Sequence, residues 1–209
     1  MSDYSELYNA ILTGNAKKAE EVTKAALAAK ADPTILVQKY MIPAMDEVGK
    51  LFECNEYFVP ELLIAARAMK ISLELITPHL TAAGVEPTGR VVIGTVQGDL
   101  HDIGKNLVAS MLEGGGFQVV DLGVDVAPER FVEAAKEKDG TIVALSALLT
   151  TTMTMMKNVI QALDKAGIRT KTKVIIGGAP ITQQYADEIG ADGYSDNASA
   201  AVALARKLA

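Results

Sequence analysis

Cysteine is almost absent from this sequence, since Cys54 is the only one among 209 residues. A single thiol cannot form an internal disulfide and cannot build a thiolate metal site by itself. Disulfide-stapled folds and thiolate metal centres are thereby excluded. We expect Cys54 to be a buried or half-buried packing residue rather than a reactive thiol.

Long apolar runs and clusters of basic residues are also missing. The longest apolar stretches, such as 91–96 and 141–149, are far shorter than the roughly 20 residues that a membrane-spanning helix needs. The N-terminus lacks the basic start and the apolar stretch of a secretory signal. The net charge is −6, and no Lys and Arg cluster of the kind found in nucleic-acid binders is present. We expect a cytoplasmic protein that binds neither membranes nor nucleic acid.

What the sequence does contain is an ordinary globular composition, with 49% hydrophobic residues and enough length for one large domain or two modest ones. In the first part of the chain, apolar residues recur at helical spacing. Asp32 is suited to cap a helix, and Pro60 is suited to start one. Pro78 should break the helical pattern. Residues 1–85 are therefore expected to form a four-helix bundle that acts as a cap domain.

From residue 86 onward, short strands alternate with helical segments. The strands are rich in Val and Ile and apolar on both faces, and we expect them at 91–96, 118–122, 141–146, 173–176 and 193–195. The helices are expected at 103–113, 128–138, 152–166, 182–189 and 197–207. This alternation is typical of a Rossmann-like (flavodoxin-like) doubly wound α/β domain with a five-stranded parallel sheet, here over residues 86–209. Such domains bind ligands beyond the carboxyl ends of the strands.

The loop after the first expected strand, residues 97–106, contains one of only two histidines in the chain. It matches neither a phosphate-binding P-loop nor the Gly-x-Gly-x-x-Gly dinucleotide fingerprint. Instead, His101 follows Asp99 by two residues and precedes Gly104 by three. An aspartate this close can accept the second ring N–H of the histidine, which fixes the tautomer and makes the other nitrogen a better metal ligand.

A metal ion at His101 would need further ligands, because an ordinary site has three or four and no other His or Cys lies nearby in the sequence. The metal must therefore bring its own equatorial ligands in a macrocycle, and a corrinoid is the best candidate. Gly98 and Gly104 would let a group of that size approach the backbone closely.

Three short motifs, each following an expected strand, carry a resemblance to a known family. They are Asp99-x-His101-x-x-Gly104, Ser146-x-Leu148 and Gly177-Gly178. In this order and at these places they closely resemble the cobalamin-binding domain of corrinoid methyl-carrier proteins and of methionine synthase. The resemblance covers nearly the whole chain, because that family also places a helical bundle of this size before the domain.

The resemblance implies that cobalamin or a related corrinoid binds base-off, with His101 replacing dimethylbenzimidazole as the lower axial ligand of the cobalt. The residues implied to contact the cofactor lie in the loops after three strands: Gly98, Asp99, Leu100, His101, Asp102, Ile103, Gly104, Ser146, Leu148, Thr150, Thr152, Gly177 and Gly178. The glycines would clear a channel for the nucleotide tail, which Ser146 and Thr150 would hydrogen-bond. Thr152 stands where methionine synthase carries a serine linked to the Asp and His pair. The threonine run could equally cap a helix.

The resemblance also implies a cover over the upper face of the corrin. The segment 57–60 stands where related proteins use an aromatic-bearing stretch for this purpose. Phe58 and Leu62 are therefore candidate cover residues, and plain packing in the bundle core is the alternative for both.

At the level of function, the resemblance implies a carrier subunit without catalytic activity of its own. Its corrinoid would alternate between methylcob(III)alamin and cob(I)alamin. The implied partners are a substrate-specific corrinoid methyltransferase, an acceptor methyltransferase with tetrahydrofolate or a thiol as acceptor, and a reductive activation protein. The sequence leaves the methyl donor open.

Three other functions remain as alternatives at this point. The small subunit of a cobalamin-dependent mutase uses the same histidine motif but does not need the helical bundle. A cobalamin-dependent sensor would need a basic DNA-binding region, which this acidic chain lacks. A flavodoxin-like module for another small ligand would leave Asp99 and His101 without a role.

Overall fold

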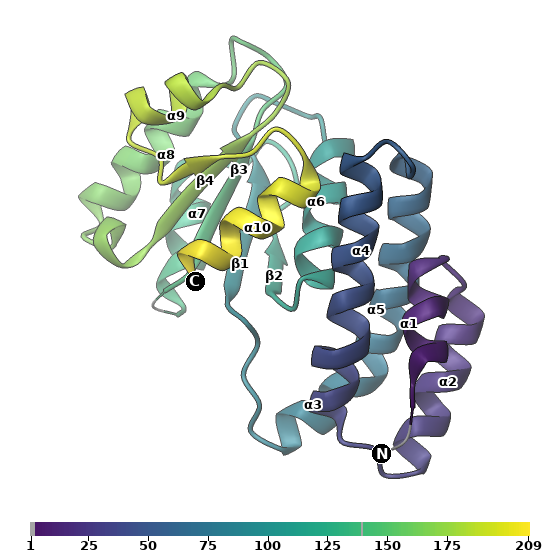
Figure 1. The fold of residues 1–209 in the computed structure, drawn as a ribbon. Helices are drawn as coiled ribbons and strands as arrows, with labels where there is room; N and C mark the ends of the chain where they lie inside the picture. Colours follow the sequence, from purple (N-terminus) through teal and green to yellow (C-terminus); the bar gives the residue numbers. More distant parts are fainter. Residues whose placement is uncertain (1–2, 139) are drawn as a thin grey trace. The chain divides into compact units, whose positions relative to one another are not determined.

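The computed structural model describes residues 3–138 and 140–209. The chain divides into two compact units. One consists of Met1–Pro87 with Glu113–Gly116, and the other of Thr88–Leu112 with Phe117–Ala209. Figure 1 shows the helices and strands of both units, and each unit has a hydrophobic core of its own.

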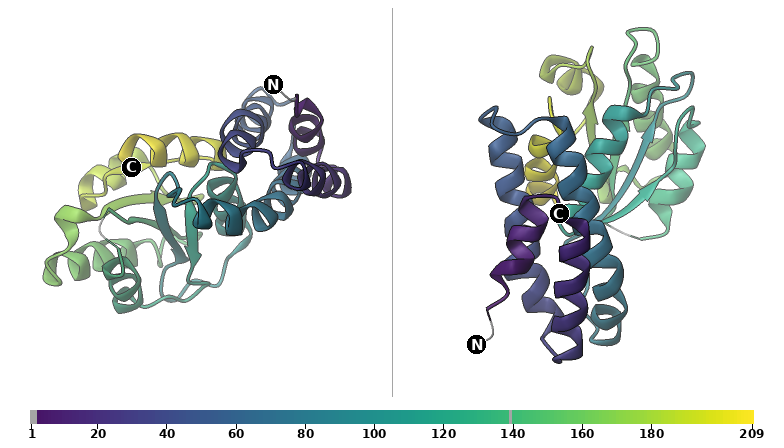
Figure 2. Two further views of the ribbon diagram at one scale, coloured as in Figure 1. Left: turned by 90° about the horizontal axis from the view of Figure 1, so that it is seen from below. Right: turned by 90° about the vertical axis from the view of Figure 1, so that its right-hand side faces the viewer.

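The first unit is a helical bundle. Its helices are α1 (Ser5–Leu12), α2 (Ala16–Ala28), α3 (Pro33–Leu36), α4 (Ile42–Glu53) and α5 (Val59–Ala82), with a π-helical turn, Val37–Met41, between α3 and α4. Because α3, this turn and α4 follow one another without a break, they form one continuous helical segment. With α1, α2 and α5 this segment makes a bundle of four (Figure 2). The four-helix bundle predicted from the sequence is confirmed.

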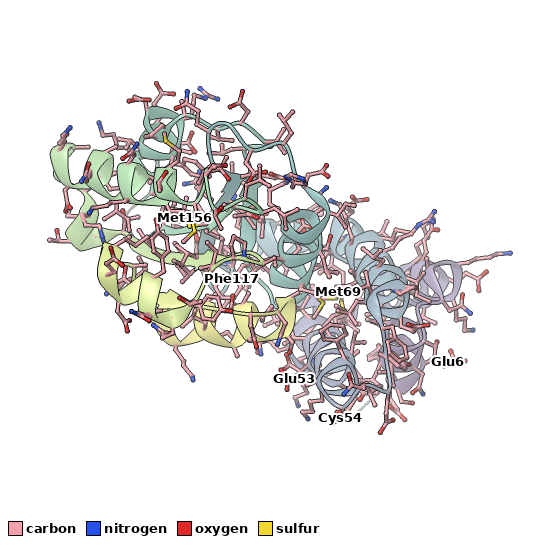
Figure 3. All side chains as sticks on the ribbon, turned by 90° about the horizontal axis from the view of Figure 1, so that it is seen from above. Glu6, Glu53, Cys54, Met69, Phe117 and Met156 are labelled. Carbon is pink, nitrogen blue, oxygen red and sulfur yellow. The ribbon has the colours of Figure 1, made fainter. Side chains whose placement is uncertain are left out.

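Local sequence explains where these helices begin and which face they bury. The Asp32 side chain accepts a hydrogen bond from the Thr34 N–H at the start of α3, as expected of an N-cap. The predicted apolar faces supply much of the core, in which Met41, Val48 and Met69 are at most 1% exposed. Figure 3 shows Met69 among the bundle helices. Helical periodicity therefore identified the buried faces correctly.

Two expectations for the bundle are wrong. Pro78 does not end the last helix, because α5 continues through it to Ala82. The missing N–H of a proline removes only one helical hydrogen bond, here in the turn before Pro78, and the helix continues for one more turn. Cys54 is exposed rather than buried, since it is the C-cap of α4 and precedes Asn55, which adopts a left-handed conformation.

The second unit is a doubly wound α/β domain, as predicted. Its strands are β1 (Arg90–Thr95), β2 (Gln118–Asp121), β3 (Ile142–Ser146), β4 (Lys173–Gly177) and β5 (Gly193–Tyr194), paired in parallel in the order β2-β1-β3-β4-β5. Its helices are α6 (Ile103–Gly114), α7 (Pro128–Lys136), α8 (Thr154–Lys165), α9 (Gln183–Ile189) and α10 (Ala198–Leu208), with a 3₁₀ turn at Arg169–Lys171.

The sheet is covered on both faces, which explains its apolar strands. Helix α10 lies on one face, and α7 and α8 lie on the other (Figure 1). All residues of β1 are buried, and Phe131 of α7 and Met156 of α8 are fully buried in the core. Figure 3 labels Met156. Met156 is therefore a packing residue. Parallel strands buried on both faces read as continuous apolar runs.

Strand order determines where a ligand can bind in this unit. The chain leaves β1 for β2 on one side and then returns to β3 on the other side of β1. The loops after β1 and β3 therefore diverge at the carboxyl edge of the sheet, which is the switch point where such folds bind ligands. Over the residues that the structure describes, neither unit has a helix long and apolar enough to cross a membrane.

Candidate functional site

The loop between β1 and α6 presents a half-exposed histidine on a buried carboxylate. The His101 side chain is 50% exposed, whereas that of Asp99 is completely buried. The distance from His101 Nδ1 to Asp99 Oδ1 is 2.7 Å. Because an ionised carboxylate can only accept, Nδ1 carries the proton, and Nε2 of the neutral ring keeps a free lone pair. His101 is thereby prepared to ligate a metal through Nε2.

The Asp99 carboxylate is surrounded by hydrogen-bond donors. Oδ1 also accepts from the His101 backbone N–H at 3.0 Å, and Oδ2 accepts from the Leu148 N–H at 2.8 Å and the Thr152 hydroxyl at 2.6 Å. Burial alone would raise the pKa of Asp99, but these hydrogen bonds outweigh it and hold the pKa well below its usual range. Asp99 therefore remains an anion.

This lowered pKa makes a pH-dependent contribution to stability. The folded-state pKa of Asp99 lies below the unfolded value of about 3.9, so its stabilising effect is present above that pH and is lost as the pH falls towards the folded value. Replacing Asp99 by Asn should lower the free energy of unfolding of the apoprotein by about 3 kcal/mol at pH 7. The difference between wild type and variant should shrink as the pH falls below about 3.9.

Urea unfolding of both apoproteins from pH 7 to pH 3, followed by circular dichroism, measures this difference. Asp164→Asn is the matched control, because Asp164 is exposed on α8, and its difference from wild type should stay small at every pH. A difference for Asp99→Asn that does not change with pH would show that the carboxylate is not held ionised by folding.

Around His101 the loop forms an open apolar platform. Leu100 is 72% exposed and Ile103 is 80% exposed, and across the switch point Leu148 is 43% exposed. A Cβ atom added to Gly104 would meet no heavy atom within 4 Å. Large exposed apolar side chains gathered in this way mark a binding surface. The surface fits a bulky, largely apolar group that approaches above the imidazole.

The donor set also limits what kind of metal group can bind. Within the described ranges, 3–138 and 140–209, no three His, Cys, Asp or Glu side chains are arranged to hold a metal ion. A metal at His101 must therefore arrive with most of its coordination already filled. A corrinoid, whose ring supplies four equatorial nitrogens, meets this requirement.

The loop after β3 supplies the partner of Asp99. Ser146 is the last residue of β3 and is half-buried, Thr150 is exposed and Thr152 is buried. The Thr152 hydroxyl contacts Asp99, and the N-cap of α8 is Met153 without a side-chain capping bond. The interpretation of the threonines as helix caps is thus wrong for Thr152. The extra methyl of this threonine fits beside Gly98, at 3.6 Å from the position of an added Cβ.

The predicted glycine pair lies at the end of β4, where Gly177 is the last residue of the strand and Gly178 begins the loop. Gly178 has φ +134°, and a Cβ there would lie 1.9 Å from the Ala147 carbonyl oxygen. A Cβ on Gly177 would lie 3.1 Å from the Ser195 carbonyl oxygen. Close backbone packing therefore accounts for both glycines in this unit. A further role in clearing a channel for a nucleotide tail stays a prediction.

In the bundle, the two candidate cover residues differ. Phe58, the N-cap residue of α5, is 60% exposed, whereas Leu62, one turn later, is completely buried. Leu62 packs in the bundle core and cannot contact a ligand unless the bundle repacks. Phe58 alone of the pair is available at the surface.

Sequence reasoning missed several side chains that shape the His101 loop. The buried Thr95 hydroxyl donates to the His101 carbonyl at 2.8 Å. The buried Lys105 ammonium pairs with Asp121 at the end of β2. Asp125, in the loop after β2, accepts from a backbone N–H of the loop at 2.7 Å. A polar residue closing an apolar strand is a signal for Thr95, but no local pattern identifies Asp125.

Comparison with known proteins connects both units to cobalamin. A B12 binding domain model matches residues 89–203, and a second B12 binding domain model matches residues 4–77. These matches extend over nearly all of the α/β unit and most of the bundle. Fold, site and family models together define a protein that binds cobalamin or a related corrinoid.

Individual relatives show which cobalamin-binding proteins this chain is similar to. Trimethylamine corrinoid protein 2 of Methanosarcina mazei is 47% identical over 197 residues, which cover 93% of this chain and 90% of that protein. The crystal structure of a cobalamin-binding protein from Desulfitobacterium hafniense is 32% identical with a TM-score of 0.82 over the whole of both chains. A chain in the methanol:cobalamin methyltransferase complex MtaBC from Methanosarcina barkeri is 32% identical with a TM-score of 0.83, and the match covers 95% of this chain and 76% of that one. This chain belongs to the B12-binding family of corrinoid proteins.

Proposed function

We propose that this protein carries a methyl group on a corrinoid between a substrate-specific methyltransferase and an acceptor methyltransferase. In this proposal residues 86–209 bind the corrinoid and residues 1–85 form its cap. The name of the Methanosarcina mazei relative, and the methyltransferase complex that contains a chain of similar fold, support this role.

One observation carries the proposal: the half-exposed His101 imidazole, held through Nδ1 by the buried Asp99. We propose that Nε2 takes the lower axial position in place of the base of the cofactor, so that the corrinoid binds base-off. When bound, the corrinoid supplies a cobalt centre that accepts and gives up a methyl group. The protein supplies orientation and electrostatics.

Asp99 and Thr152 adjust how strongly His101 ligates. The Asp99 carboxylate makes Nε2 a better donor by accepting the Nδ1 proton. When His101 does not ligate, the Asp99 carboxylate still accepts the Nδ1 proton and keeps the ring in place. The Thr152 hydroxyl donates to Oδ2 of Asp99 at 2.6 Å and stabilises this carboxylate. We propose that these three side chains share the proton that accompanies release of His101.

We propose that substrate recognition resides in the partner enzymes, because B12-binding models account for most of both units. The relatives themselves carry different substrates in their names, trimethylamine in one and methanol in the other. Tetrahydrofolate or a thiol is the proposed acceptor, and a reductive activation protein is proposed to restore inactive cofactor. All of these partners are proposed to act in the cytoplasm.

The experiment that tests the proposal is reconstitution of the apoprotein with hydroxocobalamin. After reduction to the Co(II) state, the electron paramagnetic resonance spectrum should show a base-off corrinoid split by one protein nitrogen. Labelling the protein with ¹⁵N should turn each triplet into a doublet. Failure to bind corrinoid, or a corrinoid whose own base stays on the cobalt, would refute His101 ligation. Methyl transfer from trimethylamine or methanol with matching methyltransferases then tests the carrier role.

Gly104 gives a test that separates binding from folding. It lies in the first turn of α6 with open space around it, so Gly104→Ala should stabilise the apoprotein by about 0.5 kcal/mol through a less flexible unfolded chain. If the corrinoid sits against this turn, the added methyl should weaken corrinoid binding on the order of tenfold through steric overlap. Thermal unfolding and cobalamin titration measure the two effects. Unchanged affinity would place the cofactor elsewhere.

A further inference from the structure

We propose that Asp125, in the loop after β2, is a positioning residue that holds the Asp99–His101 pair in its ligating geometry. This inference rests on the proposed function, because it concerns how the same histidine is presented to the corrinoid. It assigns to an exposed residue outside the three sequence motifs a direct part in building the site.

Asp125 forms hydrogen bonds with two consecutive residues of the histidine loop, Gly98 and Asp99. Its Oδ1 accepts a hydrogen bond from the Gly98 N–H at 2.7 Å. Its own backbone N–H donates to the Asp99 carbonyl oxygen at 3.0 Å. The two contacts hold the Gly98 N–H and the Asp99 carbonyl, which lie on either side of the Gly98–Asp99 peptide bond, and so restrain the backbone that carries the Asp99 side chain.

With these contacts, Asp99 is hydrogen-bonded from the loops after both neighbouring strands, β2 and β3. β1 lies between β2 and β3 in the sheet. From the β3 side, the Leu148 N–H and the Thr152 hydroxyl bind the Asp99 carboxylate. From the β2 side, Asp125 binds the backbone of the same residue. With main chain and side chain both fixed, Oδ1 stays in place for the 2.7 Å contact with His101 Nδ1.

The backbone conformation of Asp125 indicates that this position requires the hydrogen-bonding carboxylate. Asp125 has φ +53° and faces Gly98, which has φ +85°. Residues other than glycine are disfavoured in this left-handed region, although Asp and Asn tolerate it better than most. Glycine would meet the backbone requirement with less strain. The carboxylate adds a charged acceptor, which forms shorter and stronger hydrogen bonds than a neutral one.

Two substitutions distinguish the contribution of the Asp125 side chain from that of its backbone conformation. Asp125→Gly keeps the left-handed conformation and removes the acceptor, whereas Asp125→Asn keeps both an Oδ1 acceptor and tolerance of positive φ. Lys30→Gly is the matched control, because Lys30 also adopts a left-handed conformation, at φ +57°, but lies in the bundle. Each full-length apoprotein is unfolded thermally, titrated with hydroxocobalamin and examined by electron paramagnetic resonance in the Co(II) state.

For Asp125→Gly we expect an unchanged or higher unfolding temperature but about tenfold weaker corrinoid binding, the lower end of the effect of outer-shell partners. A smaller fraction of its cobalt should show the protein nitrogen. Asp125→Asn should restore most of both properties, and Lys30→Gly should bind as wild type does.

The inference is overturned if Asp125→Gly matches wild type in affinity and in the His101-ligated fraction. It is also overturned if Asp125→Gly and Asp125→Asn lose unfolding temperature and ligation alike, since Asp125 would then serve the fold. An absence of protein nitrogen in the wild-type spectrum is a separate outcome, because it refutes the proposed function before any variant is compared.

Discussion

His101→Ala is expected to abolish protein ligation of the corrinoid while the apoprotein remains folded. The imidazole is half-exposed, and Asp99 keeps its donors from Leu148 and Thr152 after the ring is removed. The nitrogen splitting from the protein should disappear from the Co(II) spectrum. Corrinoid affinity should fall by tenfold or more, because loss of even an outer-shell partner of a metal ligand costs about that much.

The chain provides its own control for this experiment. His79 is the other of its two histidines and is exposed near the end of α5. His79→Ala should therefore leave the spectrum and the affinity unchanged. Free imidazole added to His101→Ala should restore a nitrogen signal, since the empty volume above Asp99 can accept it. Persistence of the protein nitrogen in His101→Ala would assign the ligand to another residue.

Gly178→Ala is expected to have the largest effect on stability. The added Cβ would lie 1.9 Å from the Ala147 carbonyl oxygen, and the glycine has φ +134°. The contact is with backbone, so no side chain can rotate away. Steric overlap and an unfavourable backbone conformation together should cost about 4 kcal/mol. Thermal unfolding followed by circular dichroism should show a midpoint lower by about 10 °C.

A second glycine separates the effect of steric overlap from that of the unfavourable backbone conformation. Gly190, the C-cap of α9, has φ +77° but open space where a Cβ would be. Gly190→Ala carries the conformational cost alone and should lower stability by about 1 kcal/mol. Equal losses in the two variants would mean that the loops after β3 and β4 move apart easily, so that the close packing at Gly178 is not important.

The architecture of each unit could be read from the sequence because it follows from local rules. Apolar residues at helical spacing and capping residues such as Asp32 predicted the bundle. Short Val and Ile runs separated by helical segments predicted the parallel sheet and its five strands. Pro78 misled the prediction, since a proline near the end of a helix interrupts little.

The central pair of the site was also visible locally. Asp99 and His101 are two residues apart in a loop that was expected after a strand, and at this spacing the carboxylate can reach the ring. The His101 Nδ1 contact at 2.7 Å therefore confirms an expectation that needed no tertiary information. The motifs after the other strands added the family, which the comparisons confirm.

The sequence by itself thus determined the class of fold, the family and the pairing of Asp99 with His101, because these depend on spacing along the chain. Only the tertiary structure decided how that pair is held. Thr152 reaches Asp99 from 53 residues away in sequence, and Asp125 reaches Gly98 from 27 away. These contacts exist because the order β2-β1-β3 places loops from both neighbouring strands around the end of β1. Separation along the chain gives no measure of such distances.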